Sequence, residues 1–399
     1  MAWWLIVLII VGVLVLLVAL YDIVQPSDPI IRNFPVVGHF RTVLSSSGPK
    51  LRQYIVAAND EERPFSRDQR TWVYGTAAGE GAYFGFGTDN VIDRDNHIII
   101  KQSTFPDTTP IGENAPLPCA KIMGAWRDRT HQFRPESVVY VSAMSYGSLS
   151  ARAVEAINRG CAVSGAMHNT GEGGVAFPHR NGGALMFQFG TGYFGCRNKD
   201  GTFSLEALCE TVASAEVGCI EVKLSQGAKP GLGGVLPGKK VTPAIAEARG
   251  VEIGQTVFSP NRHSAFHDVD GLIDFVETIA DATGLPVGIK SAVGQQAFWD
   301  ELAQRMAARN QGPDFITIDG GEGGTGAAPL VFSDHVSLPF REGFARAHQP
   351  FVAAGLHQHI IFSGSGRLGF PADALLAFAM GVDMIGLARE PMLALGCIQ

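Results

Sequence analysis

Two lysines in one glycine-rich stretch are the residues of this sequence best suited to bind an anion. The stretch runs from Glu221 to Gly238 and reads EVKLSQGAKPGLGGVLPG, with Lys223 near its start and Lys229 further along. Polar and apolar residues alternate from Ile220 to Ser225, which predicts a strand with one face on a core. The glycines that follow tolerate positive φ and let the backbone approach a ligand closely. The stretch therefore predicts an anion site, with solvated lysines on a surface loop as the alternative.

Short apolar stretches alternate with helix-period stretches from Val138 onward. This alternation predicts a parallel sheet, and its count favours a (β/α)8 TIM barrel over an open doubly wound sheet. We assign residues 138–399 to this barrel. The predicted strands are Val138–Ala143, Ala184–Phe189, Ile220–Leu224, Pro286–Ser291, Phe315–Asp319, His359–Ser363 and Met384–Leu387. The predicted helices include Ser148–Ser164, Leu205–Val217, Asp270–Thr283, Gln295–Asn310 and Pro371–Met380.

The ligand of such a barrel lies at the carboxyl ends of its strands, so the residues after each strand are the candidates. Besides the lysine stretch, small or polar runs occur at Ser142–Gly147, Asn169–Gly174, Gln188–Gly192, Lys290 in GIKSAVG, Asp319–Gly326 and Ser363–Arg367. Each run alone is ordinary turn chemistry. Together they predict one site on one face of the barrel.

The last two runs resemble a phosphate cradle. Backbone N–H groups of successive glycines and a following helix N-terminus attract anions, and this fold usually binds phosphate there. The candidate residues are Gly323, Gly324, Thr325, Gly364, Gly366 and Arg367. Gly364 to Gly369 also spells G-x-G-x-x-G, but too few residues follow for a dinucleotide-binding domain.

A phosphate site beside Gln188, Lys223 and Lys290 suits a flavin mononucleotide (FMN). Lysine can stabilise negative charge on the reduced flavin ring, and the protein's task is to position and tune that ring. A barrel-rim ion pair is the alternative for either lysine. Glu172 is a candidate base or hydrogen-bond acceptor, or simply a turn cap.

Composition fits an α/β enzyme and argues against several other classes. Hydrophobic residues make up 46% of the chain, and there are 48 glycines. A net charge of -7 gives no basic patch for nucleic acid. The six cysteines form no C-x-x-C pair, and His263 with His267 lacks the context of a metal site, so we expect free thiols and no metal.

Residues 2–21, AWWLIVLIIVGVLVLLVALY, carry no charge and are long enough to cross a bilayer. We predict an uncleaved transmembrane anchor rather than a signal peptide, because no basic residue precedes the run and no small-x-small site follows it. Arg32, Arg41, Lys50 and Arg52 come next, so the positive-inside rule places the catalytic body in the cytoplasm.

Residues 27–137 are rich in turn signals. We predict a small irregular α+β segment there, with a few strands such as Asn96–Ile100 and no long helix.

Several of these motifs resemble the FMN-binding synthase domain of glutamate synthases, from about Ser137 to the C-terminus. They are SAMSYGSLS around Ser145, NTGEGG around Glu172, VKLSQGAKPG with Lys223 and Lys229, SPNRH ending at His263, DGGEGGTGA from Asp319 and ALGC ending at Cys397. More closely, the chain resembles the short, membrane-anchored, single-subunit members of that family.

The resemblance implies reduction of 2-iminoglutarate, formed from 2-oxoglutarate and ammonia, to glutamate by hydride transfer from reduced FMN. It implies catalytic roles for Lys223, Glu172 and Lys229, the last two facing the substrate. The FMN contacts it implies are Met144, Ser145, Gln188, Lys223, Gly324, Gly364, Gly366 and Arg389. The sequence contains no recognisable NAD(P)H or ferredoxin site, so the partners expected are a small substrate, the membrane and an unidentified electron donor.

The chain departs from the family pattern at several positions. Leu232 and Val235 replace the glutamate and the 2-oxoglutarate-binding glutamine of G-E-G-G-Q. Tyr193 stands where the family has arginine, with Arg197 nearby as the expected substitute. The family's iron–sulfur cluster needs three cysteines after the barrel, of which only Cys397 is present here, so we do not expect that cluster.

Two other functions stay open. One is an FMN barrel that oxidises a small hydroxy or amino acid, for which His263 is the candidate base. The other is a catalytically silent, membrane-anchored flavin-binding scaffold, which the replacements at Leu232 and Val235 favour.

Overall fold

The computed structural model describes residues 2–26, 29–52, 61–80, 87, 88, 90–106 and 117–397. The chain divides into two compact units, Met1–Ile92 and Asp93–Gln399.

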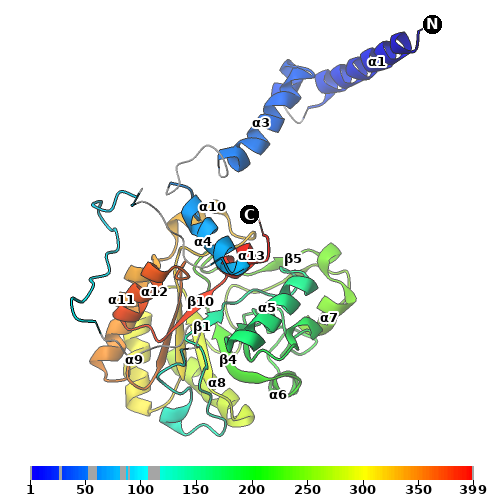
Figure 1. The fold of residues 1–399 in the computed structure, drawn as a ribbon. Helices are drawn as coiled ribbons and strands as arrows, with labels where there is room; N and C mark the ends of the chain where they lie inside the picture. Colours follow the sequence, from blue (N-terminus) through cyan, green and yellow to red (C-terminus); the bar gives the residue numbers. More distant parts are fainter. Residues whose placement is uncertain are drawn as a thin grey trace. The chain divides into compact units, whose positions relative to one another are not determined.

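Eight parallel strands close into a barrel in the second unit, and helices surround them (Figure 1). Around the barrel the strands follow the order β1-β10-β9-β8-β7-β4-β3-β2. Their bounds are β1 Val139–Val141, β2 His168–Asn169, β3 Leu185–Phe189, β4 Val217–Lys223, β7 Val287–Ser291, β8 Phe315–Asp319, β9 Ile361–Ser365 and β10 Met384–Leu387. The predicted (β/α)8 TIM barrel is confirmed.

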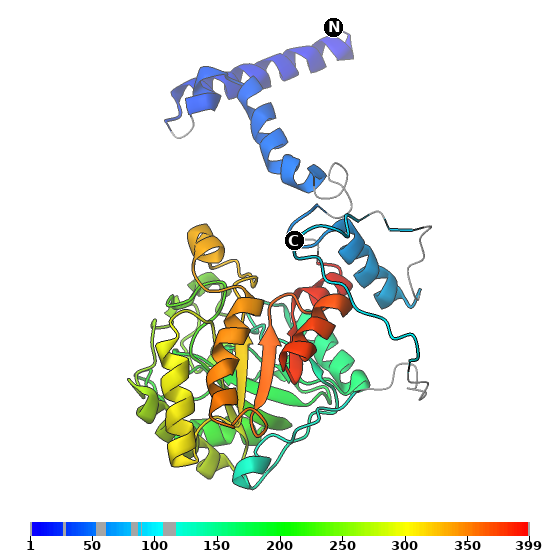
Figure 2. The same ribbon diagram turned by 90° about the vertical axis from the view of Figure 1, so that its left-hand side faces the viewer.

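The helices of this unit are α5 Ala151–Ser164, α6 Leu205–Ala213, α7 Pro243–Arg249, α8 Val269–Thr283, α9 Ala297–Arg309, α10 Leu330–His335, α11 Phe340–Ala353, α12 Pro371–Met380 and α13 Arg389–Ala394. Short 3-10 turns lie at Ala125–Arg127, Phe177–His179 and Gly238–Lys240. In Figure 2, α9, α11 and α12 cover the neighbouring strands of the barrel.

Helix α8 illustrates why these segments are helical. Asp268 accepts a hydrogen bond from Gly271 N at 2.8 Å and so caps the first turn. Ile273 and Val276 lie on the apolar face that is buried against the barrel. Gly284, with φ at 71°, ends the helix in the left-handed conformation that glycine adopts without strain.

Three elements of the barrel differ from the prediction, one in its end and two because they were not predicted. The helix predicted to reach Val217 ends at Ala213, because Val217 already pairs with Leu185 in the sheet. Strand β2 has two residues, too few to show a periodicity. Helix α11 was missed because Pro350 inside it is a helix-breaking signal that packing overrides.

The lysine stretch contributes one strand to a small antiparallel ribbon that the sequence did not indicate. Strand β5 (Val235–Leu236) pairs antiparallel with β6 (Val257–Phe258). The chain after β4 is therefore not one open loop, because part of it forms a two-stranded ribbon over the carboxyl end of the barrel.

The chain before β1 packs against the barrel's amino-terminal end. Cys119 and Met123 are buried in one cluster with strand residues such as Phe315. Arg129 ion-pairs with both Asp314 and Glu277. This segment precedes the barrel boundary predicted at residue 138, so the compact unit includes more chain than the eight strands and their helices.

The first unit contains helices α1 Trp3–Val24, α2 Pro29–Asn33, α3 Val37–Leu51 and α4 Arg67–Ala78. Helix α1 is long and apolar enough to cross a membrane, and its side chains are unburied apart from Asp22 at its end.

The prediction of an irregular segment without long helices is wrong, since α3 and α4 lie within it. Asn96–Ile100 forms no strand, and no strand occurs in the described parts of residues 27–137. Ile99 and Ile100 are exposed, so the apolar run has no sheet neighbour to pair with.

Candidate functional site

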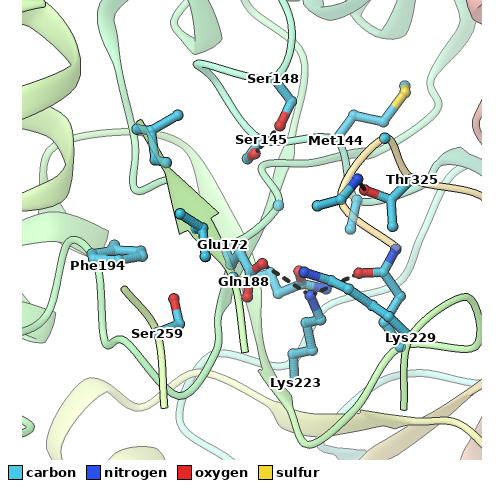
Figure 3. Close-up of a pocket in the computed structure, with 18 of the residues that line it drawn as sticks. Met144, Ser145, Ser148, Glu172, Gln188, Phe194, Lys223, Lys229, Ser259 and Thr325 are labelled. Carbon is cyan, nitrogen blue, oxygen red and sulfur yellow. Dashed lines mark hydrogen bonds and ion pairs between the residues drawn. The ribbon is translucent and has the colours of Figure 1, made fainter. Parts of the chain in front are cut away.

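A cavity of about 290 Å³ lies at the carboxyl ends of the barrel strands (Figure 3). The residues that line it come from the ends of β1, β2, β3, β4, β7 and β8 and from the β5–β6 hairpin. Nine predicted site residues are among them: Met144, Ser145, Glu172, Gln188, Lys223, Lys229, Lys290, Gly324 and Thr325.

Lys223 and Glu172 form an ion pair in this cavity. Lys223 Nζ lies 3.1 Å from Glu172 Oε1 and donates to Gln226 Oε1 at 3.2 Å. Burial opposes ionisation of the carboxyl, but the charge of Lys223 and its hydrogen bond outweigh burial and lower the pKa of Glu172. Glu172 is therefore an ionised acceptor at neutral pH and not only a turn cap.

Lys290 lies in the floor of the cavity and is almost fully buried. Its Nζ is 3.3 Å from Asp319 Oδ1. Burial disfavours the ammonium, but the charges of Asp319 and Glu221 outweigh it and raise the pKa of Lys290. Lys290 is a fixed positive charge beneath whatever occupies the cavity.

Glu221 is a buried carboxylate that the sequence analysis missed. It accepts hydrogen bonds from Gln188 Nε2 at 2.6 Å, Asn169 Nδ2 at 2.8 Å and Thr317 Oγ1 at 2.6 Å. The alternation along β4 suggested a solvent-facing side for this residue. In a closed barrel the second face of a strand points into the barrel interior instead, so the polar residues of four strands meet there.

Lys229 and Arg249 are the cavity's two cations that are not ion-paired with any carboxylate in the described part of the chain. Lys229 is buried, and among the described residues its Nζ donates only to Gly233 O, at 3.4 Å. Burial and the like charge of Lys223 lower the pKa of Lys229, although Glu172 opposes this.

Arg249 was not predicted as a site residue. It is the last residue of α7, where an arginine usually complements the helix dipole. Its position in the sequence therefore gives no sign of a role in the cavity. The side chain is buried, its Nη2 donates to Tyr146 O at 3.2 Å, and its Cζ lies 4.9 Å from the centre of the Phe194 ring. Its Nε is buried and has no hydrogen-bond partner in the described structure.

Two glycines let the loops at the strand ends approach one another. A Cβ on Gly171, which has φ at 64°, would lie 2.6 Å from Ser145 N. A Cβ on Gly227 would lie 2.0 Å from Gly320 O, and Gly227 N donates to Asp319 Oδ2 at 2.8 Å. The glycines of these loops therefore hold the strand ends together as well as leaving room for a ligand.

Two of the predicted phosphate residues border a separate hollow next to this cavity. Gly366 and Arg367 border a second hollow of about 230 Å³, together with Glu322. Arg389 Nη2 donates to Glu322 O at 2.6 Å. Glu322 lines the second hollow, and Gly324, two residues further along the same loop, lines the first cavity. The two hollows therefore adjoin at the loop that follows β8.

Gly323, Gly364 and Arg389 line neither hollow. A Cβ on Gly364 would lie 2.6 Å from the Phe340 ring, so glycine is required there by packing.

His263 is fully engaged in structural hydrogen bonds. Tyr193 Oη accepts from Ser264 N and Ala265 N, so its own proton goes to His263 Nδ1, at 3.1 Å. His263 Nε2–H is then left to donate to Lys223 O at 2.9 Å. Burial lowers the pKa of His263 to about 4. This neutral histidine supports the end of β4 and has no free nitrogen to act as a base.

The positions at which the chain departs from the family pattern have different locations. Val235 lines the cavity, whereas Leu232 borders only a smaller neighbouring hollow. Tyr193 is buried in the core. Arg197, the expected substitute for the family arginine, does not line the cavity and donates to Gly192 O at 3.2 Å. That expectation is wrong, and Arg249 is the arginine at the cavity.

These residues fit FMN. Buried Lys290 supplies a permanent positive charge to the cavity floor, which suits an electron-rich reduced flavin ring. The adjoining hollow is lined by Arg341 and Arg367, by the carboxylates Glu322 and Asp373, and by α12 residues from Asp373 to Met380. Its two arginines are the candidate phosphate ligands, since this fold usually binds phosphate at this end of the barrel.

Comparison with known proteins identifies the family of the chain. The model of the conserved region in glutamate synthase matches residues 122–399. The glutamate synthase large subunit-like protein YerD of Bacillus subtilis (strain 168) is 33% identical, with 98% of this chain and 82% of that protein aligned. The archaeal-type glutamate synthase (NADPH) of Thermotoga sp. (strain RQ2) is 34% identical over 67% of this chain and 50% of its own length, so this chain spans half of that relative.

Among solved structures, a mandelate oxidase variant with a monooxide FMN adduct aligns with a TM-score of 0.40 and 18% identity, over 65% of this chain and 68% of that one. The match to the family model covers most of the barrel unit, and YerD aligns along nearly the whole chain. The chain therefore belongs to the glutamate synthase family.

Proposed function

We propose that this chain is a membrane-anchored, FMN-dependent oxidoreductase that reduces 2-iminoglutarate, or a closely related imino acid, to the amino acid. The imino acid would form from the 2-oxo acid and ammonia. Family membership and a cavity that fits FMN support the reaction class. The choice of substrate depends on the charges of the cavity.

The pair of unneutralised cations is the observation that carries this proposal. Lys223 is matched by Glu172 and Lys290 by Asp319, within ion-pair distance in both cases. Lys229 and Arg249 remain without a carboxylate partner among the described residues. Two buried positive charges are stabilised by a ligand with two negative charges, and a five-carbon dicarboxylic imino acid has that charge.

We expect the residues of the cavity to divide the work as follows. Bound reduced FMN supplies a hydride. Lys229 and Arg249 bind the substrate carboxylates. Ionised Glu172, oriented by Lys223, accepts a hydrogen bond from the iminium nitrogen and so holds the imine carbon toward the flavin. The proposed cofactor contacts that line the main cavity are Met144, Ser145, Gln188, Lys223, Lys290, Gly324 and Thr325. Gly366 and Arg367 line the adjoining hollow, and Gly323, Gly364 and Arg389, which line neither, stay predicted contacts.

The engagement of His263 argues against a hydroxy-acid oxidase of this fold, because its ring nitrogens already bond Tyr193 and the Lys223 backbone. The reoxidation experiment described next distinguishes an enzyme from a catalytically silent scaffold.

The test is anaerobic reoxidation of the photoreduced, detergent-purified protein by 2-oxoglutarate plus ammonia, followed by flavin absorbance. We expect substrate-dependent reoxidation, and a KM for 2-oxoglutarate that rises about tenfold or more in Arg249→Gln, since hydrogen bonds to charged groups contribute about 1.5–3 kcal/mol. Arg197→Gln is the matched control, because Arg197 also lies near the Phe194 ring, at 5.5 Å, but does not line the cavity.

Absence of flavin bands after FMN is added would refute the cofactor and the proposal with it. Flavin that is reducible but not reoxidised by any 2-oxo acid with ammonia would favour the scaffold. Equal KM changes in Arg249→Gln and Arg197→Gln would remove Arg249 from the substrate site.

Helix α1 supports the membrane part of the proposal. Its 22 apolar-rich residues span about 33 Å, which matches a hydrocarbon core of about 30 Å. The basic residues that follow it would keep the barrel unit in the cytoplasm.

A further inference from the structure

The start of helix α3 is hydrogen-bonded to the end of helix α1, although α2 lies between them in the sequence. Asp22, in the last turn of α1, is fully buried. Its carboxylate accepts a hydrogen bond from Val36 N at 2.8 Å and contacts His39 Nε2 at 2.9 Å. The first turn of α3 is therefore bonded directly to the last turn of α1, and Figure 2 shows α3 leaving the line of α1 at this join.

One face of α3 is apolar and exposed. Val37, Phe40, Leu44 and Leu51 follow one another at spacings of three, four and seven residues, which places them on the same side of a helix. All four are exposed, Val37 by 71% and Phe40 by 65%. Ser46 lies on the other side of the helix and is also exposed.

The charged residues of the same segment are all basic. Residues 29–52 contain no acidic residue and four basic ones, Arg32, Arg41, Lys50 and Arg52. Lys50 and Arg52 lie at the C-terminal end of α3 and are exposed. An apolar stripe with basic residues beside it is the pattern of a helix that lies in the headgroup region of a membrane.

We infer that α3 is an interfacial helix that lies on an anionic lipid surface, with Val37, Phe40, Leu44 and Leu51 directed into the bilayer. This inference rests on the proposed membrane anchoring by α1. If α1 crosses the bilayer, the bonds of Asp22 hold the start of α3 at the depth where α1 leaves the hydrocarbon. Lipid is then the nearest apolar medium for the exposed stripe, and the basic residues match anionic headgroups.

An interfacial α3 would give the chain a second membrane contact after its anchor. The expected consequence is a fixed distance between the bilayer and the chain that follows α3, instead of a free tether.

The test places a fluorophore at single positions of the full-length chain. Cys209 and Cys397 are the partly exposed thiols and are replaced by serine, whereas the other four cysteines are buried. Separate Phe40→Cys, Ser46→Cys and Ile10→Cys variants are labelled and placed in nanodiscs of phosphatidylcholine and phosphatidylglycerol. These lipids carry a nitroxide either near the headgroup or deep in the acyl chain.

We expect the shallow nitroxide to quench the label at position 40 at least about twice as strongly as it quenches the label at position 46. The reason is that an interfacial helix buries its apolar face by about 5–10 Å. The deep nitroxide should quench the label at position 10.

The possible failures are distinguishable. Quenching at position 10 with equal, weak quenching at 40 and 46 would overturn the interfacial helix and leave the anchor intact. A label at 40 that is shielded from nitroxide and from aqueous iodide would also overturn it, because protein, such as a second copy of the chain, would then cover the face. No quenching at 10 would refute the anchor itself, and the inference with it.

Discussion

The lysines of the cavity differ in their electrostatic partners, and those partners assign their roles. Lys290 faces Asp319 at 3.3 Å and is a permanent charge of the floor. Lys223 faces Glu172 at 3.1 Å and orients that carboxylate. Within the described ranges, Lys229 bonds only a backbone oxygen, so it is the lysine that we propose to bind a substrate carboxylate. Residue type alone does not distinguish the three.

Val235 is the cavity residue at which a substitution should improve binding. In the family pattern a glutamine helps to bind 2-oxoglutarate at this position, and here the apolar side chain lines the cavity. We predict that Val235→Gln lowers the KM for 2-oxoglutarate by about threefold to tenfold, the effect of one added hydrogen bond of about 1 kcal/mol. Steady-state kinetics with varied 2-oxoglutarate measures this effect.

Leu232→Gln is the control for this prediction. Leu232 belongs to the same glycine-rich stretch but does not line the main cavity, so its replacement should leave KM unchanged. An unchanged KM in Val235→Gln would argue that the substrate does not reach this wall.

Among the elements, the loop after β8 depends on one side chain for its attachment to α11. Both carboxylate oxygens of Glu322 accept from Phe340 N, at 3.0 and 2.9 Å, in the first turn of that helix. The backbone oxygen of Glu322 accepts from Arg389. Gly324 and Thr325 follow on the same loop and line the cavity. A helix cap therefore also positions the proposed flavin contacts.

We predict that Glu322→Ala lowers the free energy of unfolding by about 1–2 kcal/mol, as the loss of a helix cap usually does. FMN affinity should fall in the same variant, because the loop that carries Gly324 loses its support. Urea unfolding and FMN titration measure the two effects.

Glu342→Ala is the matched control for the cap. Glu342 is also in the first turn of α11, but it is exposed, and Arg346 is its one ion-pair partner among the described residues. Its removal should therefore cost about 0.5 kcal/mol or less. Equal losses of stability in the two variants would show that the Glu322 cap contributes no more than a surface charge.

Across the whole barrel unit, buried neutral histidines make stability depend on pH. Burial lowers the pKa of His168 to about 3, and that of His179 and of His263 to about 4. An unfolded histidine has a pKa near about 6.5. Between these values the unfolded chain binds more protons than the folded one, so the unfolding free energy falls as pH falls.

We predict that the unfolding free energy of the detergent-solubilised chain decreases as the pH drops below about 6.5, by up to about 1.4 kcal/mol per pH unit for each of these histidines. His263→Asn should reduce this slope by about one histidine's share, while His267→Asn should leave it unchanged because His267 is exposed. Urea unfolding at a series of pH values measures the slope. An identical slope in His263→Asn and in the unsubstituted chain would show that His263 is not held neutral by the fold.

Local patterns in the sequence determined the parts of this protein that depend on short-range order. The alternation of strands and helices predicted the barrel, and the rule that ligands lie at strand ends identified Glu172, Gln188, Lys223 and Lys290 as neighbours, all of which line one cavity. The 20-residue uncharged run predicted the long apolar helix at the N-terminus. Each of these features is visible within a window of a few residues because periodicity and turn chemistry are local.

Tertiary structure alone decided the partners of the buried polar groups. Thr317 bonds Glu221 across 96 positions of sequence, and no local pattern marks either residue for this contact. Arg249 reaches the cavity because α7 packs there, while Arg197, nearer in sequence to the family arginine, is directed elsewhere. Strand register and helix packing bring such residues together, and both are set by burial of apolar surface over the whole barrel.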